Sequence, residues 1–398
     1  MPAAPTAPHA PCAYLDHAAS TPMRREAIEV LTEVARTHHA NPSGSHRAAR
    51  AARQVIEEAR ETVADALGAR PGEVVFTSGG TEADNLAVFG VCARRRGVVV
   101  ASAIEPPAVA EPVGSLGGVT VGVDRRGVLD LDALDEVLGR IQAAGDEVGL
   151  VSVMAVNNEV GTVQPLAEVA ARVRERAPGA ALHTDAVQAV PWVDVASGAA
   201  PFDLVAVSAH KFGGPKGVGA LVVREGTALA AQVRGGGQER ERRSGTPNVA
   251  GIAAAAAALA AAVAERPATV ARVGALRDRL ADGLAVAIPG LIETGVVPGL
   301  DGRPDRRHKV AGNCHVCIEG VESESLLFLL EEAGVAASAA SSCASGAMAP
   351  SPVLAAMGVD RTAARGALRL SLGATSTEAD VEAVLGALPA AVERLRRF

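Results

Sequence analysis

Aromatic side chains are scarce in this chain of 398 residues, at 2% of the composition, although hydrophobic residues make up 48%. The core must therefore be filled mainly by Ala, Val and Leu. Few aromatic rings also leave few platforms on which bases or sugars could stack. The formal net charge is −7 and the arginines are scattered, so the sequence offers no basic face for a phosphate backbone. These shortages argue against nucleic acid as a partner.

Cysteine is also sparse. The five cysteines are odd in number and irregularly spaced, which is typical of a reducing cytoplasm rather than of a disulfide framework. The first fifteen residues contain four prolines and no basic segment, so we interpret them as a loose leader and not as a secretion signal. The most apolar long run, 249–264, is mostly alanine and shorter than a membrane span. We expect a cytoplasmic protein with no membrane segment, and a buried helix at 249–264.

The length favours two domains, and the pattern predicts that the first is α/β. Between about 50 and 265, short Val-rich runs alternate with longer amphipathic segments, beginning with a helical stretch at 50–67. Continuous apolar runs separated by helices indicate a mainly parallel sheet covered on both faces. Ligands of such sheets bind at the carboxyl ends of the strands. The expected strands are 74–76, 98–101, 150–156, 181–184, 204–207 and 220–223.

The pattern changes after the alanine-rich helix, which we expect to end near Arg266 and Pro267. A long helix is then expected at 270–287, a polar surface loop at 299–309, a strand at 316–318 and a helix at 323–333. We interpret this part as a smaller α+β domain. The predicted boundaries are 1–20 for an N-terminal segment that packs on the small domain, 21–266 for the large domain and 267–398 for the small domain.

One lysine stands at the end of an apolar run. The run 202–207 is followed by Ser208, His210 and Lys211 and then by a glycine-rich turn at 212–219. An amine held at the lip of a buried strand is less stable as an ammonium ion, so its pKa falls and it can attack an aldehyde, as a Schiff-base lysine does. Taken alone, the same residues also fit a surface lysine beside a hairpin turn.

Other strand ends carry groups suited to a charged aromatic cofactor. Glycines and hydroxyls at 77–81 precede a helix, where backbone N–H groups and the helix dipole bind anions and Thr81 adds a hydroxyl. Asp185, which follows strand 181–184, could keep a ring nitrogen protonated, although the N-cap of a helix would use the same residue. A phosphate-type turn, an aspartate, an amide side chain and a lysine together are the partners that pyridoxal phosphate needs.

With these residues in place, the sequence resembles the cysteine desulfurases, within the class V aminotransferase group of fold type I pyridoxal-phosphate enzymes. The resemblance covers nearly the whole chain and implies a large domain with a mainly parallel sheet and a smaller α+β C-terminal domain. It rests on blocks that follow the family's order, at 14–22, 41–43, 76–86, 157–161, 185–188, 208–219, 235–240 and 243–246.

The resemblance assigns a role to each motif. Lys211 would bind pyridoxal 5'-phosphate covalently, Asp185 would pair with the pyridine nitrogen and Gln188 would contact the ring hydroxyl. Thr246 would reach the phosphate from a second subunit, which implies a homodimer. An arginine fork suits the substrate carboxylate because it bonds both oxygens. The remaining implied cofactor contacts are Gly80, Thr81, Asn158, Ser208 and His210, and the implied substrate contacts are Asn41, Asn158 and Arg369.

A stretch of small residues, 336–350, has no amphipathic period and contains one thiol, Cys343. In the family, the matching cysteine attacks the sulfur of L-cysteine and becomes a persulfide, with alanine as the co-product. A nucleophile that accepts sulfur and then transfers it must be a thiolate and must move, and a loop of small residues allows that movement. An ordinary packed cysteine is the alternative. The resemblance implies a sulfur-acceptor protein, for iron–sulfur cluster assembly, tRNA thiolation or cofactor synthesis.

Two features differ from the family. The position of the histidine that stacks on the ring and moves protons is Pro106, which has neither a titratable group nor a π-face. The end of the chain lacks the extension by which housekeeping members dock an iron–sulfur scaffold. The resemblance therefore leaves that partner open, and a tRNA-thiolating or cofactor-making protein is an alternative acceptor. Cys314 and Cys317 have zinc-like spacing but no second ligand pair follows, so no metal is assigned.

The change to Pro106 leaves two alternatives open. A different pyridoxal-phosphate reaction, such as a β-lyase or an aminotransferase, would not need the thiol of Cys343. A homologue of low activity, or one with no catalytic role, would retain the fold and use its surface.

Overall fold

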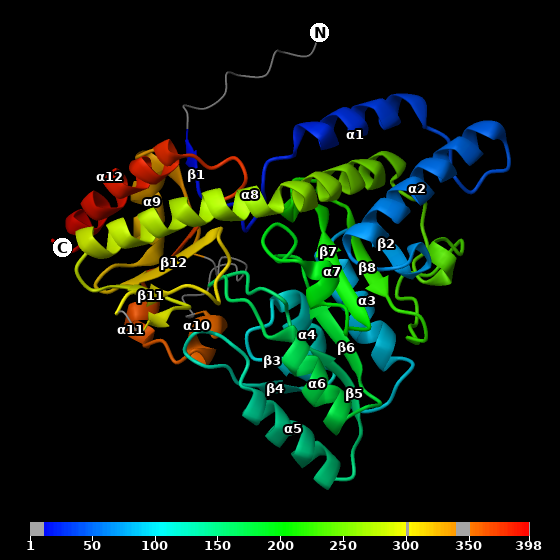
Figure 1. Ribbon diagram of the computed structural model, residues 1–398, viewed down its shortest axis with the longest axis horizontal. Coiled ribbons are helices and arrows are strands. Elements are labelled where there is room, and N and C mark those ends of the chain that lie inside the picture. Colours follow the sequence, from blue (N-terminus) through cyan, green and yellow to red (C-terminus); the bar gives the residue numbers. More distant parts are fainter. Residues whose placement is uncertain (1–11, 300–301, 340–350, 398) are drawn as a thin grey trace. The chain divides into compact units, whose positions relative to one another are not determined.

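The computed structural model describes residues 12–299, 302–339 and 351–397 (Figure 1). The described chain divides into two compact units. The large unit contains residues 20–158 and 162–268, and the small unit contains residues 12–19, 159–161 and those from 269 onward. A short piece, 159–161, therefore belongs to the small unit although the chain on both sides of it belongs to the large one.

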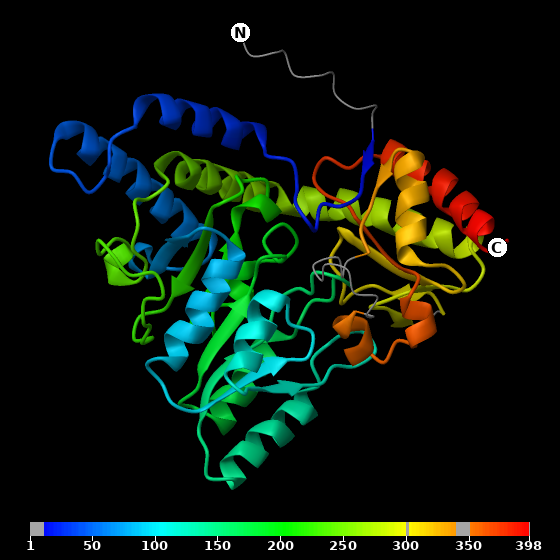
Figure 2. The same cartoon turned by 180° about the vertical axis from the view of Figure 1, so that it is seen from behind.

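The large unit is built on a seven-stranded sheet with the order β2-β8-β7-β6-β5-β3-β4, seen from both sides in Figures 1 and 2. Strand β8 is antiparallel to both of its neighbours, β2 and β7, and the other pairs are parallel. The predicted α/β fold with a mainly parallel sheet is thus confirmed. Among the seven strands of this sheet, β4 alone was not predicted, because it has three residues and two of them are exposed. The strand predicted at 150–156 ends earlier, at Ser152. The strands are β2 Val74–Thr77, β3 Val98–Ser102, β4 Val119–Val121, β5 Val148–Ser152, β6 Ala181–Asp185, β7 Leu204–Ser208 and β8 Gly219–Val223.

Helix α3 (Gly80–Cys92) holds the centre of this unit together. Its small and aliphatic residues Ala83, Leu86 and Ala87 are buried in one cluster with Leu204 of β7 and Leu221 of β8. Short side chains let the helix lie close to the sheet, which fits the scarcity of aromatic residues. The other helices before residue 200 are α1 Arg25–Thr37, α2 Arg47–Ala66, α4 Pro107–Ser115, α5 Leu131–Ala143, α6 Leu166–Arg176 and α7 Val195–Gly198.

Helix α8 (Val249–Ala287) corrects one expectation. It continues through Pro267 for 39 residues, whereas the sequence predicted a break there. Proline removes one hydrogen bond from a helix, and the long apolar segment on its N-terminal side compensates for that loss by burial. By length and composition α8 could cross a membrane, but half of its most apolar window is buried. Because Ala254, Ala258 and Leu259 have at most 1% of their surface exposed, we interpret α8 as a core helix.

The small unit contains an antiparallel sheet with the order β14-β12-β9, formed by Ala367–Ser371, Asn313–Ile318 and Leu291–Glu293. Strand β1 (Ala13–Tyr14) pairs in parallel with β13 (Val335–Ala336), and β10 (Val297–Pro298) pairs with β11 (Pro304–Asp305). The helices are α9 Ser323–Glu332, α10 Pro352–Ala356, α11 Arg361–Ala364 and α12 Glu378–Leu395.

Two details of the small unit bear on the sequence analysis. Cys314 and Cys317 are buried in β12, and burial raises the pKa of each thiol to about 12. No cluster of three potential metal ligands occurs in the part of the chain that the structure describes. The surface-loop prediction for 299–309 is wrong at its end, because the Lys309 side chain is buried and donates to the carbonyl oxygen of Thr294 at 2.7 Å.

Candidate active site

The residues of the candidate site follow strands that end at one edge of the large-unit sheet. Strands β5, β6 and β7 run in parallel, so their carboxyl ends share this edge. Strand β2 is antiparallel to β8 and β8 is antiparallel to β7, so β2 also ends there. The edge therefore collects Thr77, Asp185 and Ser208, each the last residue of its strand. This is where ligands of parallel sheets bind.

Lys211 lies directly after this edge, at the end of a single 3-10 turn, Ala209–Lys211. Its side chain is close enough to Asp185 for its positive charge to lower the pKa of that carboxyl. The neighbouring His210 is partly buried, and burial followed by the charges of Lys211 and Lys216 lowers its pKa to about 4. His210 Nδ1 lies 3.3 Å from the hydroxyl of Ser20. At neutral pH the turn thus presents a neutral imidazole beside Lys211.

Asp185 is buried, and its Oδ1 accepts the N–H of Val187 at 2.7 Å. Burial, together with the nearby Asp84 carboxyl, raises the pKa of Asp185 to about 8, while the Val187 N–H, His183 and Lys211 oppose the rise. Without a further positive charge, the carboxyl therefore holds a proton at neutral pH. A cationic ring nitrogen would be the natural partner for its ionised form.

His183 and Asp84 form a second pair of buried titratable groups near Asp185. His183 precedes Asp185 by two residues on β6, so both side chains point to the same face of the strand. His183 Nδ1 lies 2.9 Å from the Ser152 hydroxyl, and Nε2 lies 3.5 Å from Oδ1 of Asp84 on α3. Burial lowers the pKa of His183 to about 4 and raises that of Asp84 to about 8. Burial thus disfavours the charged form of both partners in the contact between His183 and Asp84.

The N-terminus of α3 forms the candidate anion site. A Cβ atom added at Gly80 would lie 2.8 Å from Val187 Cγ2, and one added at Gly79 would lie 3.8 Å from the Ser208 hydroxyl. The glycine at position 80 thus lets the turn pack closely against Val187, and the turn lies beside Ser208. Thr81 in the first turn of α3 is exposed, so its hydroxyl is accessible from the same side. The N–H groups of the turn suit a phosphate.

The structure brings seven of the predicted site residues to this edge, which are Gly80, Thr81, Asp185, Gln188, Ser208, His210 and Lys211. Asn158 follows β5 in the same unit. Asn41 and Thr246 are exposed in the large unit, and the Asn41 side-chain oxygen accepts the N–H of Ser43 at 2.9 Å. Arg369 lies on β14 of the small unit, where its Nη2 donates to Oδ1 of Asp16 at 2.9 Å. Cys343 lies outside the described residues.

Pro106 is the N-cap of α4, with φ −68° and ψ 159°. The residues before it are held at the sheet edge, since Glu105 Oε1 accepts the N–H of Met154 at 2.7 Å and Asn157 Nδ2 donates to the Ile104 carbonyl at 3.0 Å. Glu105 is buried, and burial raises its pKa, as do the charges of Asp185 and Asp84. The position where the family has a histidine is therefore fixed by the backbone and carries a ring that cannot titrate.

Sequence reasoning missed Asp84, His183 and Glu105. One signal was available, because the two-residue spacing of His183 and Asp185 puts both on one face of a strand. No spacing in the sequence links Asp84 to His183, which lies 99 positions further along the chain.

The Asp84 carboxyl predicts a pH effect on stability. In the unfolded chain it loses its proton near its ordinary pKa of 3.8, whereas in the fold it keeps the proton up to about pH 8. The folded state therefore binds more protons between these values, and this group lowers the stability as the pH rises. Asp84→Asn removes that cost. We expect the melting temperature of the ligand-free variant, relative to wild type, to increase from pH 5 to pH 8. A difference that does not change with pH would contradict the assignment.

The chain matches the family model described as aminotransferase class-V over residues 13–384. It is 45% identical to an IscS-like cysteine desulfurase of Mycobacterium tuberculosis over 397 residues, which covers 97% of each chain. The solved structure of a NifS-like protein superimposes with a TM-score of 0.85 at 33% identity and covers 97% of this chain and 100% of that one. A structure described as SspA in complex with cysteine has a TM-score of 0.74 at 29% identity and covers 92% and 99%. The chain therefore belongs to the aminotransferase class-V family and, within it, to the cysteine desulfurases.

Proposed function

We propose that this chain converts L-cysteine to L-alanine, with pyridoxal 5'-phosphate as its cofactor and a persulfide on Cys343 as the form in which sulfur leaves. The observation that carries this proposal is the edge of the large-unit sheet, where the buried Asp185, the adjacent Lys211 and the anion turn of α3 come together. One similar structure contains cysteine, which supports the substrate.

The residues at this edge fit the cofactor. The Gly79–Thr81 turn and Ser208 offer N–H and hydroxyl donors for its phosphate. The Asp185 carboxyl, ionised beside a cationic ring nitrogen, would keep that nitrogen protonated, and Gln188 follows three residues later. Pyridoxal phosphate, when bound, supplies an electron sink for the bonds at the substrate's α-carbon. His210 is neutral and can share a hydrogen bond without adding positive charge.

The remaining steps fall to side chains of the protein. The Lys211 amine takes the proton from the substrate α-carbon and later returns one to it. The Cys343 thiolate attacks the sulfur of L-cysteine, so that the S–S bond forms, the Cβ–S bond breaks and the bonding pair stays with the carbon. A proton then converts that carbon to the methyl group of alanine. One cysteine and one thiol thus give one alanine and one persulfide, and no external oxidant is needed.

The substrate carboxylate has candidate partners in Arg369, Asn41 and Asn158. Arg369 is supported by its guanidinium, whose two parallel N–H donors match a carboxylate. It is buried against Asp16, so the aspartate would have to share this arginine with the substrate.

Three parts of the proposal concern the setting of the enzyme. We propose a homodimer in which Thr246 serves the phosphate site of the second subunit, and its exposure in the single chain supports this. We also propose a cytoplasmic location, which the cysteine pattern supports. The sulfur acceptor would be another protein, for cluster assembly, tRNA thiolation or cofactor synthesis.

A different pyridoxal-phosphate reaction is the second candidate, because Pro106 stands in place of the histidine. A β-lyase or an aminotransferase would use Lys211 in the same way but would need no thiol.

The test is an assay of alanine and sulfide from L-cysteine in the presence of a reducing thiol. We expect equal amounts of both products from the wild type. Cys343→Ser is expected to lower alanine formation at least about tenfold, since a hydroxyl is a far weaker nucleophile toward sulfur than a thiolate. Cys92→Ser, which changes a partly buried cysteine of α3, is the matched control and should behave as wild type. Undiminished turnover in Cys343→Ser, or pyruvate in place of alanine, would support the lyase.

A further inference from the structure

The segment that carries Thr246 contains an unusual backbone. Residues Glu239, Arg240 and Glu241 have φ values of 47°, 55° and 63° in succession, and none of them is glycine. A left-handed conformation is unfavourable for a residue with a side chain, because the Cβ atom lies too close to the following carbonyl oxygen. Such a turn persists only where the surrounding structure holds it. Two ion pairs in the large unit do so.

The first ion pair joins Glu239 to Arg60 of α2. Arg60 Nη1 and Nη2 donate to the two carboxylate oxygens at 2.7 and 2.8 Å, and the N–H of Phe76 donates to Oε2 at 2.9 Å. Only 4% of the Arg60 side chain and 6% of the Glu239 side chain are exposed. Arg60 also lies 4.8 Å from the centre of the Phe76 ring. Because both charges are buried and paired, the loss of Arg60 would leave the Glu239 carboxylate without this cation, whereas Arg60 also contacts Glu57 at 3.1 Å.

The second ion pair joins Arg243 to Glu82 in the first turn of α3. Arg243 Nε donates to Oε1 at 2.7 Å and Nη2 donates to Oε2 at 3.2 Å. The same Glu82 carboxylate accepts the N–H of Ser78 at 2.9 Å. Glu82 therefore fixes the turn that begins α3 and the segment before Thr246 at the same time. Arg243 also neutralises a negative charge that would otherwise lie beside the candidate anion site.

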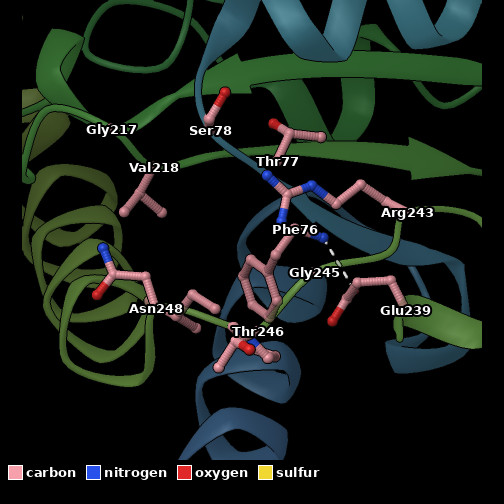
Figure 3. Close-up of a pocket in the computed structure, with 12 residues that line it drawn as sticks. Phe76, Thr77, Ser78, Gly217, Val218, Glu239, Arg243, Gly245, Thr246 and Asn248 are labelled. Atoms are coloured by element: carbon pink, nitrogen blue, oxygen red, sulfur yellow. Dashed lines mark hydrogen bonds between the residues drawn. The ribbon is translucent and has the colours of Figure 1, made fainter. Parts of the chain in front are cut away.

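Both ion pairs border one cavity of about 110 Å³, shown in Figure 3. Thr77 and Ser78 line it from the turn before α3, and Thr246 and Asn248 line it from the other segment. The dashed line in the figure is the hydrogen bond from the Phe76 N–H to Glu239. The strand, turn and helix that form the anion site are thus connected to the Thr246 segment by charged contacts at the border of this cavity.

We propose that these two ion pairs form a clamp that couples the anion site of one subunit to its hold on the second subunit. The inference rests on the proposed function, in which the turn before α3 binds the cofactor phosphate and Thr246 crosses to the partner. A phosphate that orders Ser78 and the start of α3 also orders Glu82, and through Arg243 the segment up to Thr246. Glu82, Arg243, Arg60 and Glu239 are positioning residues and touch no reacting atom.

The test measures how pyridoxal phosphate changes subunit exchange. Two populations of the full chain with different affinity tags are mixed, with and without the cofactor, and the half-time for mixed dimers is recorded. For the wild type we expect the cofactor to slow the exchange about fivefold or more, the lower end of ordinary coupling between sites. Arg243→Gln should bring this ratio close to one. Glu82→Gln should do the same from the other side, while keeping an oxygen that accepts the Ser78 N–H.

Arg174→Gln is the matched control. It removes a partly exposed arginine that binds both oxygens of Asp203, a carboxylate that also accepts a backbone N–H, that of Leu182. This pair has the same design as Arg243 and Glu82 but does not contact the turn before α3. The control should keep the wild-type ratio, and circular dichroism should show that all variants are folded.

The possible outcomes distinguish a failure of the clamp from a failure of the proposed function on which it rests. A wild-type ratio near one, an unchanged ratio in both clamp variants, or an equal loss in Arg174→Gln would overturn the clamp. Borohydride reduction of the same wild-type samples gives the second readout, because it links bound pyridoxal phosphate to Lys211. If no adduct forms, the proposed cofactor site is wrong, whereas an adduct without coupling rejects only the clamp.

Discussion

Lys211→Ala is expected to lower alanine formation from L-cysteine by at least about a thousand-fold. General acid–base catalysis alone contributes 10²–10⁴-fold, and Lys211 is also the covalent attachment point in the proposed function. The variant should also lose the adduct that borohydride fixes on the wild type. The measurement is the initial rate of alanine release at saturating cofactor, so that weaker cofactor binding does not limit the rate.

Lys216→Ala is the appropriate control for this experiment. Lys216 belongs to the same glycine-rich turn but is exposed, and its charge contributes to lowering the pKa of His210, as that of Lys211 does. Lys216→Ala removes one positive charge near His210 but leaves Lys211 in place, so we expect this variant to retain activity. If Lys211→Ala kept even a tenth of the wild-type rate, the alternative interpretation from the sequence would hold. Lys211 would then be a surface lysine beside a hairpin turn.

The removal of Lys211 should also change Asp185. The positive charge of Lys211 is one of the groups that oppose the rise in the Asp185 pKa. Without it, the carboxyl holds its proton to a higher pH and is a poorer partner for a cationic ring nitrogen. The two residues therefore act as a unit, and their effects on the rate should not be additive.

The sequence predicted the sheet of the large unit well because its strands are short, continuous Val-rich runs. Each run is buried on both faces, as for β7, where all five residues are buried. The polar groups just after these runs then identify the ligand edge, since parallel strands end on one side. Helix α8 shows the limit of this approach. Pro267 is a strong local signal for a helix end, and the burial of the preceding residues overrides it.

The groups that support the site were harder to predict, because they depend on contacts between distant positions. Arg60 and Glu239 are 179 positions apart, and each is an ordinary charged residue of a helix or a loop in the sequence. The three left-handed residues at 239–241 include no glycine, so the sequence gives no sign of their conformation. Asp84 lies on a helix whose neighbouring residues Ala83 and Leu86 are apolar, and only the fold shows that it contacts His183. Local sequence patterns thus predicted the residues at the strand ends. The residues that hold them in position or shift their pKa values became visible only in the tertiary structure.

Pro106→His is expected to raise turnover about 100-fold, the lower end of what a positioned acid–base group contributes. The backbone can accept the change, since φ −68° and ψ 159° are available to any residue. The following Pro107 favours this extended conformation in the residue before it, so it also holds a histidine in place. The hydrogen bonds of Glu105 and Asn157 keep this corner at the sheet edge whatever side chain position 106 carries.

The pH profile of this variant distinguishes proton transfer from a simple packing effect. An imidazole at position 106 should add to kcat an inflection near pH 6.5 that we do not expect in the wild type. Pro106→Phe supplies a ring that can stack but cannot titrate, so it should give the gain from stacking alone and no inflection. An equal gain in both variants would assign the effect to stacking. If Pro106→His turned over at the wild-type rate, Lys211 alone would be sufficient to move the proton, and Pro106 would be no deficit in this enzyme.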